Sequence, residues 1–183
     1  MTRAASTRPV AGIILAGGQS RRMGTDKAEL EFRGRRLLDL AGDLLSEAGC
    51  DSVHVSGRPG LDNAIPDTTS GQGPAHAMLD CLEALGDRIA GILFLPVDMP
   101  LLKLADLAPL LDGDPETARA WADHPLPAYV PAAVSRRARD QVRSVRSLLA
   151  TFPIDWLPLD PGQAARFANL NTQADLTAAR KMR

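Results

Sequence analysis

Apolar blocks alternate with amphipathic blocks along the first half of the chain. Apolar runs at 10–15, 52–56 and 91–97 predict three strands, and the last run is uncharged, which is typical of a strand buried on both faces. Between these runs, apolar residues recur at helical spacing over 37–48 and 75–85, and a glycine follows each block. The order of the blocks predicts consecutive β-α-β units.

Such an order is typical of an α/β protein with a single Rossmann-like, doubly wound and mostly parallel sheet. Ligands in these sheets bind beyond the carboxyl ends of the strands. The apolar runs at 10–15 and 91–97 lead into Gly17 and Asp98. We therefore expect these two residues on the same rim of the sheet, although they lie far apart in the sequence.

The second half of the chain is less regular. Its patterns predict strands at 117–122, 128–130 and 154–159 around a turn over 123–127. An apolar stripe predicts a helix across 134–149. Thr172 is in position to cap a C-terminal helix that runs through Ala179.

Composition narrows the class of protein. The 183 residues are 45% hydrophobic and contain no linker or repeat, so we expect one domain over 1–183, with 1–9 as a disordered leader. A net charge of −1 and 4% aromatic residues disfavour nucleic acid and a membrane surface as partners. No apolar run reaches membrane-spanning length, and a cytoplasmic location is expected.

The cysteines and histidines give little sign of chemistry. Cys50 and Cys81 form no C-x-x-C, and two buried thiols are expected, although a disulfide stays open. The three histidines lack the spacing of zinc ligands.

The residues after the first apolar run carry the strongest chemical pattern. Leu15 and Ala16 lead into the glycine pair Gly17 and Gly18, and Arg21, Arg22, Gly24 and Lys27 follow. Glycines allow a polyanion to approach backbone N–H groups, and the arginines and lysine supply positive charge. The spacing fits neither the common phosphate loop nor the dinucleotide fingerprint. The pattern favours a nucleoside triphosphate site of another kind; the alternative is a glycine-rich turn with solvated arginines.

The string L-A-G-G-x-S-x-R-M-G-x-D-K at residues 15–27 resembles the signature of the small nucleotidyltransferases that include the molybdenum cofactor guanylyltransferases. Residues 95–101, Leu-Pro-Val-Asp-Met-Pro-Leu, resemble the P-x-D-x-P element of the same family. Mg²⁺ typically takes one or two carboxylates together with substrate phosphates. The resemblance therefore implies that Asp98 is a Mg²⁺ ligand; without it, Asp98 equally fits a turn cap.

Further binding residues come partly from this resemblance and partly from the local pattern. Ser56 and Asp67 match positions that contact the nucleotide. Gly73 lies in a glycine loop before the helix predicted at 75–85, and the free N–H groups of such a loop favour contact with a nucleotide. The family usually has G-P-L-A-G here, and only the Gly-Pro of residues 73–74 matches it. His76 in that loop is expected to be a solvated or capping residue.

Three segments of the second half resemble family elements, and the first of them lies beside the pterin site in that family. They are 124–128 ("PL-x-A"), 143–149 (R-S-L-R-x-L-L, with an arginine for the pterin phosphate) and 167–176 (F-x-N-x-N-T-x-x-D-L). Within the last, Asn169 and Asn171 are implied to hold metal-bound water or substrate phosphate, with helix capping as the alternative.

The resemblance implies transfer of GMP from Mg·GTP to the terminal phosphate of molybdopterin or molybdenum cofactor, with release of pyrophosphate. Residues 10–100 would form the nucleotide-binding half and 101–183 the pterin-binding half. The implied catalytic residues are Lys27, Arg22 and Asp98. The implied binding residues are Leu15, Ala16, Gly17, Gly18, Lys27, Ser56, Asp67, Gly73, Asp98, Asn169 and Asn171. A molybdoenzyme or chaperone would accept the product.

Two alternatives to a guanylyltransferase remain. A cytidylyltransferase acting on the same pterin is the nearer one, although those relatives tend to carry L-A-A-G in place of the L-A-G-G at 15–18. A non-catalytic nucleotide-binding module on the same fold is the other, since fold alone does not establish activity. Retention of both Lys27 and Asp98 favours an enzyme.

Overall fold

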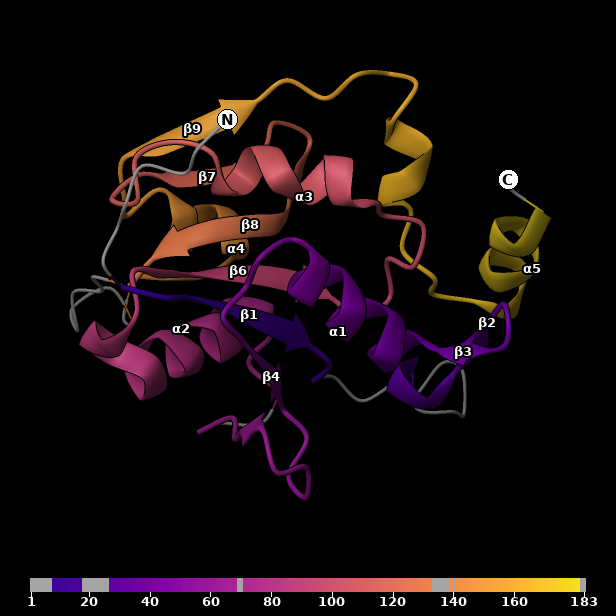
Figure 1. Ribbon diagram of the computed structural model, residues 1–183, viewed down its shortest axis with the longest axis horizontal. Helices are drawn as coiled ribbons and strands as arrows, with labels where there is room; N and C mark the ends of the chain where they lie inside the picture. Colours follow the sequence, from indigo (N-terminus) through magenta and orange to yellow (C-terminus); the bar gives the residue numbers. More distant parts are fainter. Residues whose placement is uncertain (1–7, 18–26, 69–70, 133–138, 140, 182–183) are drawn as a thin grey trace.

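The computed structural model describes residues 8–17, 27–68, 71–132, 139 and 141–181. Within them lies a seven-stranded sheet with strand order β5-β4-β1-β6-β8-β7-β9, covered by helices on both faces (Figure 1). Its strands are β1 (Val10–Leu15), β4 (Ser52–Ser56), β5 (Ala64–Ile65), β6 (Gly91–Pro96), β7 (Ala118–Trp121), β8 (His124–Pro131) and β9 (Ile154–Leu157). The helices are α1 (Leu37–Glu47), α2 (Pro74–Leu85), α3 (Leu104–Leu111), α4 (Val145–Leu149) and α5 (Gln173–Lys181).

The sheet is mostly parallel, as predicted. β1 pairs in parallel with β4 and with β6, β4 with β5, and β7 with β9; only the pairs of β8 with β6 and with β7 are antiparallel. A separate short pair joins β2 (Glu31–Phe32) to β3 (Arg35–Arg36). Helix α5 lies beside this pair (Figure 1), and Arg180 Nη2 donates to the carbonyl oxygen of Glu31 at 2.9 Å.

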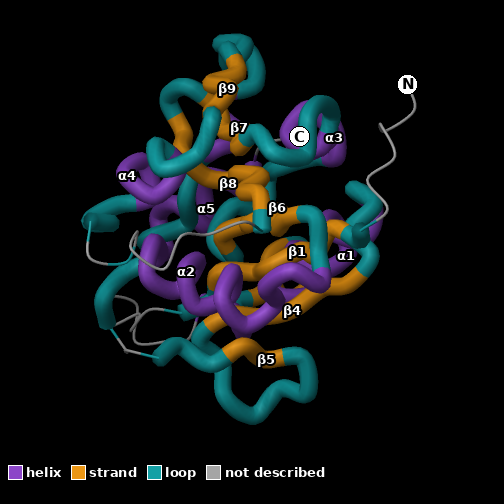
Figure 2. Tube along the Cα trace, turned by 90° about the vertical axis from the view of Figure 1, so that its left-hand side faces the viewer, coloured by secondary structure: helices purple, strands orange, loops and turns teal. Residues whose placement is uncertain are grey.

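Side chains of β1 alternate between two cores, one on each face of the sheet. Ile13 faces the core formed with α2 and α4, while Ile14 faces the core formed with α1, α3 and α5. Figure 2 shows α2 and α4 on one side of the strands and α1 and α3 on the other. This two-faced burial explains the uninterrupted apolar runs of β1 and β6.

Two expectations for the second half are wrong in part. Strand β8 begins at His124, where the sequence predicts a turn that lasts to residue 127. Pro125 and Pro127 lack N–H donors, yet they fit in this strand because its pairing with β6 begins only at Ala128. The turn is therefore shorter than predicted, and the strand is longer.

The helix predicted across 134–149 is the second partial error. Residues 133–138 and 140 lie outside the described residues, 141–144 are not helical, and α4 occupies only 145–149. The hydroxyl of Ser144 accepts from the N–H of Ser147, so a cap starts the helix there. Helix α3 has no counterpart among the predicted elements, and Pro109 lies inside it.

The two cysteines differ in exposure. No disulfide joins them, and Cys81 is buried as expected, but Cys50 is only partly buried. Burial raises the pKa of the Cys81 thiol to about 12. In the part of the chain that the structure describes, no helix is long and apolar enough to cross a lipid bilayer.

Candidate active site

A cavity of about 390 Å³ opens at the carboxyl ends of β1, β4 and β6. The register aligns Leu15 with both Ser56 and Pro96, so these three strand ends meet at one edge. Predicted site residues that line the cavity are Leu15, Ala16, Gly17, Lys27, Ser56, Asp67, Gly73, Asp98 and Asn169. Among the described residues, the cavity is also lined by Gly71, Gln72, Pro74, Ala77, Pro96, Val97 and Leu126. The predicted Gly18 and Arg22 lie outside the described residues.

Lys27 lies at the centre of a polar contact between three distant segments. Its Nζ donates to Asp98 Oδ2 at 2.7 Å and to Asn171 Oδ1 at 2.7 Å. The side chains of Lys27 and Asp98 keep 21% and 16% of their exposure, so the pair is accessible to solvent and to a ligand of the cavity. The structure thus brings together the residues expected for phosphate and for metal.

The C-terminal segment is attached to the same site through its backbone. The N–H of Leu170 donates to the carbonyl oxygen of Asp98 at 2.8 Å. The Asp175 carboxylate accepts from the N–H groups of Asn171 and Thr172, while Thr172 Oγ1 accepts from the N–H of Asp175. This reciprocal cap confirms the role predicted for Thr172, and the hydrogen bond with Thr172 lowers the pKa of Asp175. The side chain of Asn171 accepts a hydrogen bond from Lys27 through its amide oxygen.

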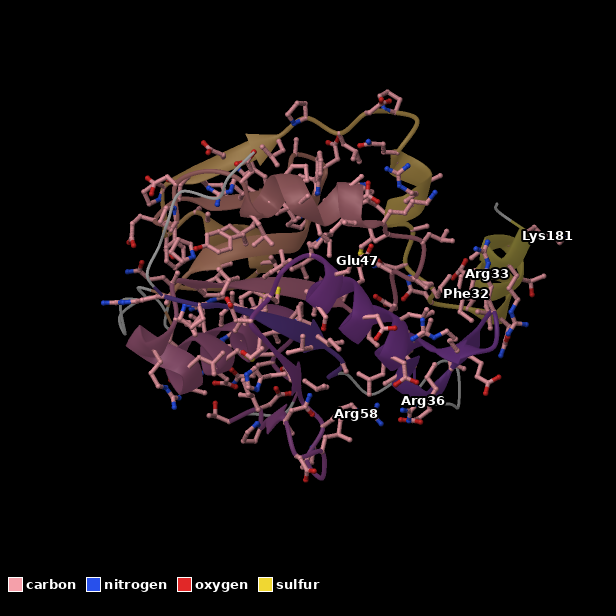
Figure 3. The ribbon with its side chains drawn as sticks, viewed as in Figure 1. Phe32, Arg33, Arg36, Glu47, Arg58 and Lys181 are labelled. Atoms are coloured by element: carbon pink, nitrogen blue, oxygen red, sulfur yellow. The ribbon has the colours of Figure 1, made fainter. Side chains whose placement is uncertain are left out.

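Lys27 begins the short 3₁₀ helix η1 (Lys27–Glu29), which ion pairs hold against neighbouring segments. The Glu29 carboxylate forms ion pairs with two arginines: its Oε2 lies 3.5 Å from Arg36 Nη1, and its Oε1 lies 3.3 Å from Arg58 Nη2. Figure 3 shows these two arginines on the same side of the molecule, one before α1 and the other after β4. The segment that carries Lys27 is therefore tied to both elements.

Two glycines touch at the ends of β1 and β4. A Cβ on Gly57 would lie 2.7 Å from Gly17 Cα and 2.9 Å from Asp67 Oδ2, and its φ is +76°. Ser56 Oγ donates to the other Asp67 oxygen, Oδ1, at 3.1 Å. Gly57 is absent from the residues predicted for the site; the signal that points to it is a glycine directly after β4, the strand that pairs in parallel with β1.

If the cavity binds the nucleoside triphosphate that the motif at 15–27 predicts, Gly57→Ala is expected to lower its affinity by at least about tenfold, because the methyl group would displace both Gly17 and Asp67. Titration calorimetry with Mg·GTP measures the change. Gly60→Ala is the matched control, since Gly60 also has a positive φ (+108°) but nothing lies within 4 Å of its Cβ position. If both variants lose affinity to the same extent, backbone strain rather than the contact with Gly17 causes the loss. If neither variant loses affinity, the contact does not matter for binding.

The cavity suits a divalent cation that arrives with its substrate. Among the described residues, no group of three or more His, Cys, Asp or Glu side chains is arranged to hold a metal alone. Mg²⁺ commonly needs only one or two carboxylates when phosphates and water complete its shell. Asp98, at the end of β6, fits that requirement.

The segments predicted for the pterin side contact one another: Arg146 donates to the carbonyl oxygen of Ala122, two residues before His124, and His124 lies against Phe167. Arg146 stacks over Trp156 with its guanidinium carbon 4.6 Å from the ring centre, and Arg143 Nη1 donates to the Val142 carbonyl. The His124 ring lies 5.0 Å from that of Phe167, and Leu126 alone from residues 124–128 lines the cavity. His76 is outside the cavity lining and contacts the Gln72 carbonyl, in keeping with the capping role expected of it.

One wall of the cavity is held by a buried carboxylate outside it. Asp80 Oδ2 accepts from the N–H of Thr68, and Oδ1 accepts from Thr68 Oγ1 and from Arg139 Nη2. Burial would raise the pKa of Asp80, but the hydrogen bonds from Arg139 and Thr68 outweigh it and the pKa lies below its usual 3.8. We call Thr68, Asp80 and Arg139 the Asp80 cluster.

This ion pair predicts a pH-dependent contribution to stability. Because folding lowers the Asp80 pKa, the contribution is fully present above pH 3.8 and is lost as the pH falls through the lower folded value. Arg139→Gln is expected to reduce the free energy of unfolding by about 2 kcal/mol at pH 7, and by less at pH 3. Urea unfolding at both pH values tests this. A difference that stays constant with pH would contradict it.

Comparison with known proteins is consistent with this geometry. Residues 12–152 match the family described as "MobA-like NTP transferase domain". The chain belongs to this family. It is therefore a nucleotidyltransferase, as the motif at 15–27 predicts.

Relatives extend over nearly the whole chain. A "Molybdenum cofactor guanylyltransferase" of Xanthomonas euvesicatoria is 34% identical over 173 residues, covering 90% of this chain and 91% of the relative. Another so named, from Rhodobacter capsulatus, is 35% identical over 190 residues and covers 93% and 94%. The resemblance to molybdenum cofactor guanylyltransferases drawn from the motifs is thereby confirmed.

Solved structures support the fold. Molybdopterin-guanine dinucleotide biosynthesis protein A from Archaeoglobus fulgidus superposes with a TM-score of 0.70 at 21% identity, covering 93% of this chain and 97% of that one. A 2-C-methyl-D-erythritol 4-phosphate cytidylyltransferase from Thermus thermophilus gives 0.68 at 17% identity, covering 94% and 97%. The nucleotidyltransferase architecture is thus shared by proteins named for different nucleotides.

Proposed function

We propose that the protein is a molybdenum cofactor guanylyltransferase, which transfers GMP from Mg·GTP to the terminal phosphate of molybdopterin or molybdenum cofactor. The observation that carries the proposal is the contact of Lys27 with Asp98 and Asn171 in a cavity beside Gly17. The substrates are those named in the curated relatives, which are called molybdenum cofactor guanylyltransferases. The cavity volume of about 390 Å³ is typical of small-ligand sites.

The reaction needs positioning and charge neutralisation more than acid–base chemistry. An oxygen of the pterin phosphate attacks the α-phosphorus of GTP, the bond from that phosphorus to the bridging oxygen breaks, and pyrophosphate leaves. The attacking phosphate monoester is largely ionised near neutral pH, because its second pKa is about 6. No general base or covalent intermediate is therefore required of the protein.

The residues then have distinct roles. Lys27, with Arg22 and the N–H groups of residues 16–18, neutralises the triphosphate. Asp98 would hold Mg²⁺, which would supply positive charge to the phosphoryl group being transferred. Asn171 fixes Lys27, and Asn169 faces the same cavity. Leu15, Ser56, Asp67 and Gly73 form the nucleotide side of the cavity.

The two halves of the chain divide the substrates. Most of the cavity lining comes from residues 10–100, which we assign to the nucleotide, while Leu126 and Asn169 come from residues 101–183, which we assign to the pterin. The labile product would pass to a molybdoenzyme or chaperone. We also propose a cytoplasmic location, where thiols such as that of Cys81 stay reduced.

A cytidylyltransferase is the second candidate, and one observation favours it. Ala77 lines the cavity, and it belongs to the Ala-His-Ala segment that departs from the family's L-A-G. Titration calorimetry with GTP, CTP, ATP and UTP, each with Mg²⁺, discriminates the two. Preference for GTP supports the guanylyltransferase, and preference for CTP transfers the proposal to the cytidylyltransferase.

Activity is tested with the nucleotide that binds best. The protein is mixed with that nucleotide, Mg²⁺ and molybdopterin, and pyrophosphate release is followed together with formation of the dinucleotide. Pyrophosphate that appears only when the pterin is present supports transfer. Tight nucleotide binding without pyrophosphate release would instead indicate a non-catalytic nucleotide-binding module.

A further inference from the structure

The Asp80 cluster contains a buried carboxylate, and burying a charged group without partners would destabilise the folded protein. The Asp80 side chain keeps 3% of its exposure, and both of its oxygens are hydrogen-bonded. Thr68 is held twice, by its N–H at 2.8 Å and by its hydroxyl at 2.7 Å. Two contacts to one carboxylate fix both the backbone and the side chain of Thr68. None of the three residues lines the cavity.

The residue before Thr68 is Asp67, which lines the cavity and accepts from Ser56 Oγ. On the other side, Asp80 belongs to α2, whose first turn supplies Pro74 and Ala77 to the same cavity. The Asp80 cluster therefore joins two walls of the cavity, the segment with Asp67 and the start of α2.

Arg139 comes from the second half of the chain, 59 positions away from Asp80. Its Nη2 is 2.7 Å from Asp80 Oδ1 and 3.1 Å from Glu83 Oε2. Glu83 keeps 43% of its exposure, so that second ion pair is solvent-screened and weak. Asp80, being buried, is the partner that depends on Arg139 for its charge to be compensated.

We propose that Asp80 is a positioning residue of the nucleotide site: through Thr68 it holds Asp67 on the cavity wall, and Arg139 is the counter-ion that this arrangement requires. The proposal rests on the function proposed above, since Asp67 is taken as a nucleotide contact. It follows that a residue of the pterin half controls nucleotide affinity.

Titration calorimetry with Mg·GTP, or with whichever nucleotide binds the wild type best, tests the proposal. Asp80→Asn keeps the volume but replaces an acceptor by a donor, and Thr68→Val keeps the shape but removes the hydroxyl. Both are expected to weaken binding by about tenfold, whereas Thr68→Ser is expected to bind as the wild type does. Arg139→Gln should weaken binding, and Arg139→Lys should restore part of it.

Glu83→Gln is the matched control, because it removes the exposed partner of Arg139 and leaves Asp80 paired. It should bind nucleotide within about twofold of the wild type. The turnover at saturating nucleotide should remain unchanged in Thr68→Val while KM rises, which a loss of folded protein would not produce. Folded Thr68→Val and Asp80→Asn that bind as tightly as the wild type would overturn the proposal.

Amide hydrogen exchange of the nucleotide-free protein gives an independent answer. The N–H of Thr68 is held by Asp80, so Asp80→Asn should speed exchange at residues 67–68 and leave that of β1 unchanged. If the wild type binds none of the nucleotides, the function proposed above fails. Amide exchange then tests by itself whether Asp80 holds the segment of Asp67 and Thr68 in place. Exchange at 67–68 equal to that of the wild type would then overturn it.

Discussion

Asp98→Asn is expected to lower the rate of nucleotidyl transfer by about a thousandfold or more while the protein stays folded. The substitution keeps the size of the side chain and removes the charge that would hold Mg²⁺. Neutralisation of developing phosphoryl charge by a metal or an arginine contributes effects of that order. The side chain keeps 16% of its exposure at the mouth of a cavity, so its loss leaves the cores on both faces of the sheet intact.

The measurement is pyrophosphate release from GTP and molybdopterin, with the thermal midpoint of unfolding recorded for each protein. Asp62→Asn is the matched control, because Asp62 lies on an exposed loop and outside the cavity lining. It should turn over as the wild type does. Near-wild-type turnover by Asp98→Asn would remove Asp98 as the metal ligand, whereas a large fall in its unfolding midpoint would make its inactivity uninformative.

The rim of the sheet was predictable from sequence because it depends on strand order alone. Gly17 and Asp98 follow two apolar runs, and parallel neighbours bring their carboxyl ends to one edge. The structure confirms this, since both residues line the same cavity. The family motif added Lys27 to the predicted site, and the structure places its ammonium group in contact with Asp98.

The supporting contacts were not predictable, because they depend on residues that are distant in sequence and carry no pattern. Gly57 matters only because Gly17 and Asp67 pack against it, and Asp80 only because Arg139 reaches it from the second half. Local chemistry also overrode periodicity. The cap at Ser144 starts α4 well inside the apolar stripe that predicted a longer helix.

Lys27→Met is expected to lower kcat/KM for GTP by about a hundredfold to ten-thousandfold and to weaken nucleotide binding as well. The methionine retains the aliphatic stem but loses the charge that Asp98 and Asn171 now share. Each lost charged hydrogen bond to phosphate is worth about 1.5–3 kcal/mol, and a further loss falls on the transition state. Titration calorimetry measures the loss of binding free energy. The change in kcat/KM measures that loss together with the loss of transition-state stabilisation.

Lys27→Arg tests whether charge alone is enough. The ammonium nitrogen lies 2.7 Å from both an oxygen of Asp98 and an oxygen of Asn171, a position for one compact donor. A planar guanidinium is larger and fixes its donors in a fork, so we expect Lys27→Arg to recover less than about a tenth of the activity. Full activity in Lys27→Arg would mean that the pocket needs only a positive charge.

The double variant Lys27→Met/Asp98→Asn distinguishes a shared role from two separate ones. If Lys27 neutralises the triphosphate while Asp98 holds the metal, both act on the same developing charge, and their losses should not add. We expect the double variant to be about as inactive as the worse single variant. Additive losses would indicate that the two residues act in different steps, so that their 2.7 Å contact serves only the protein without nucleotide.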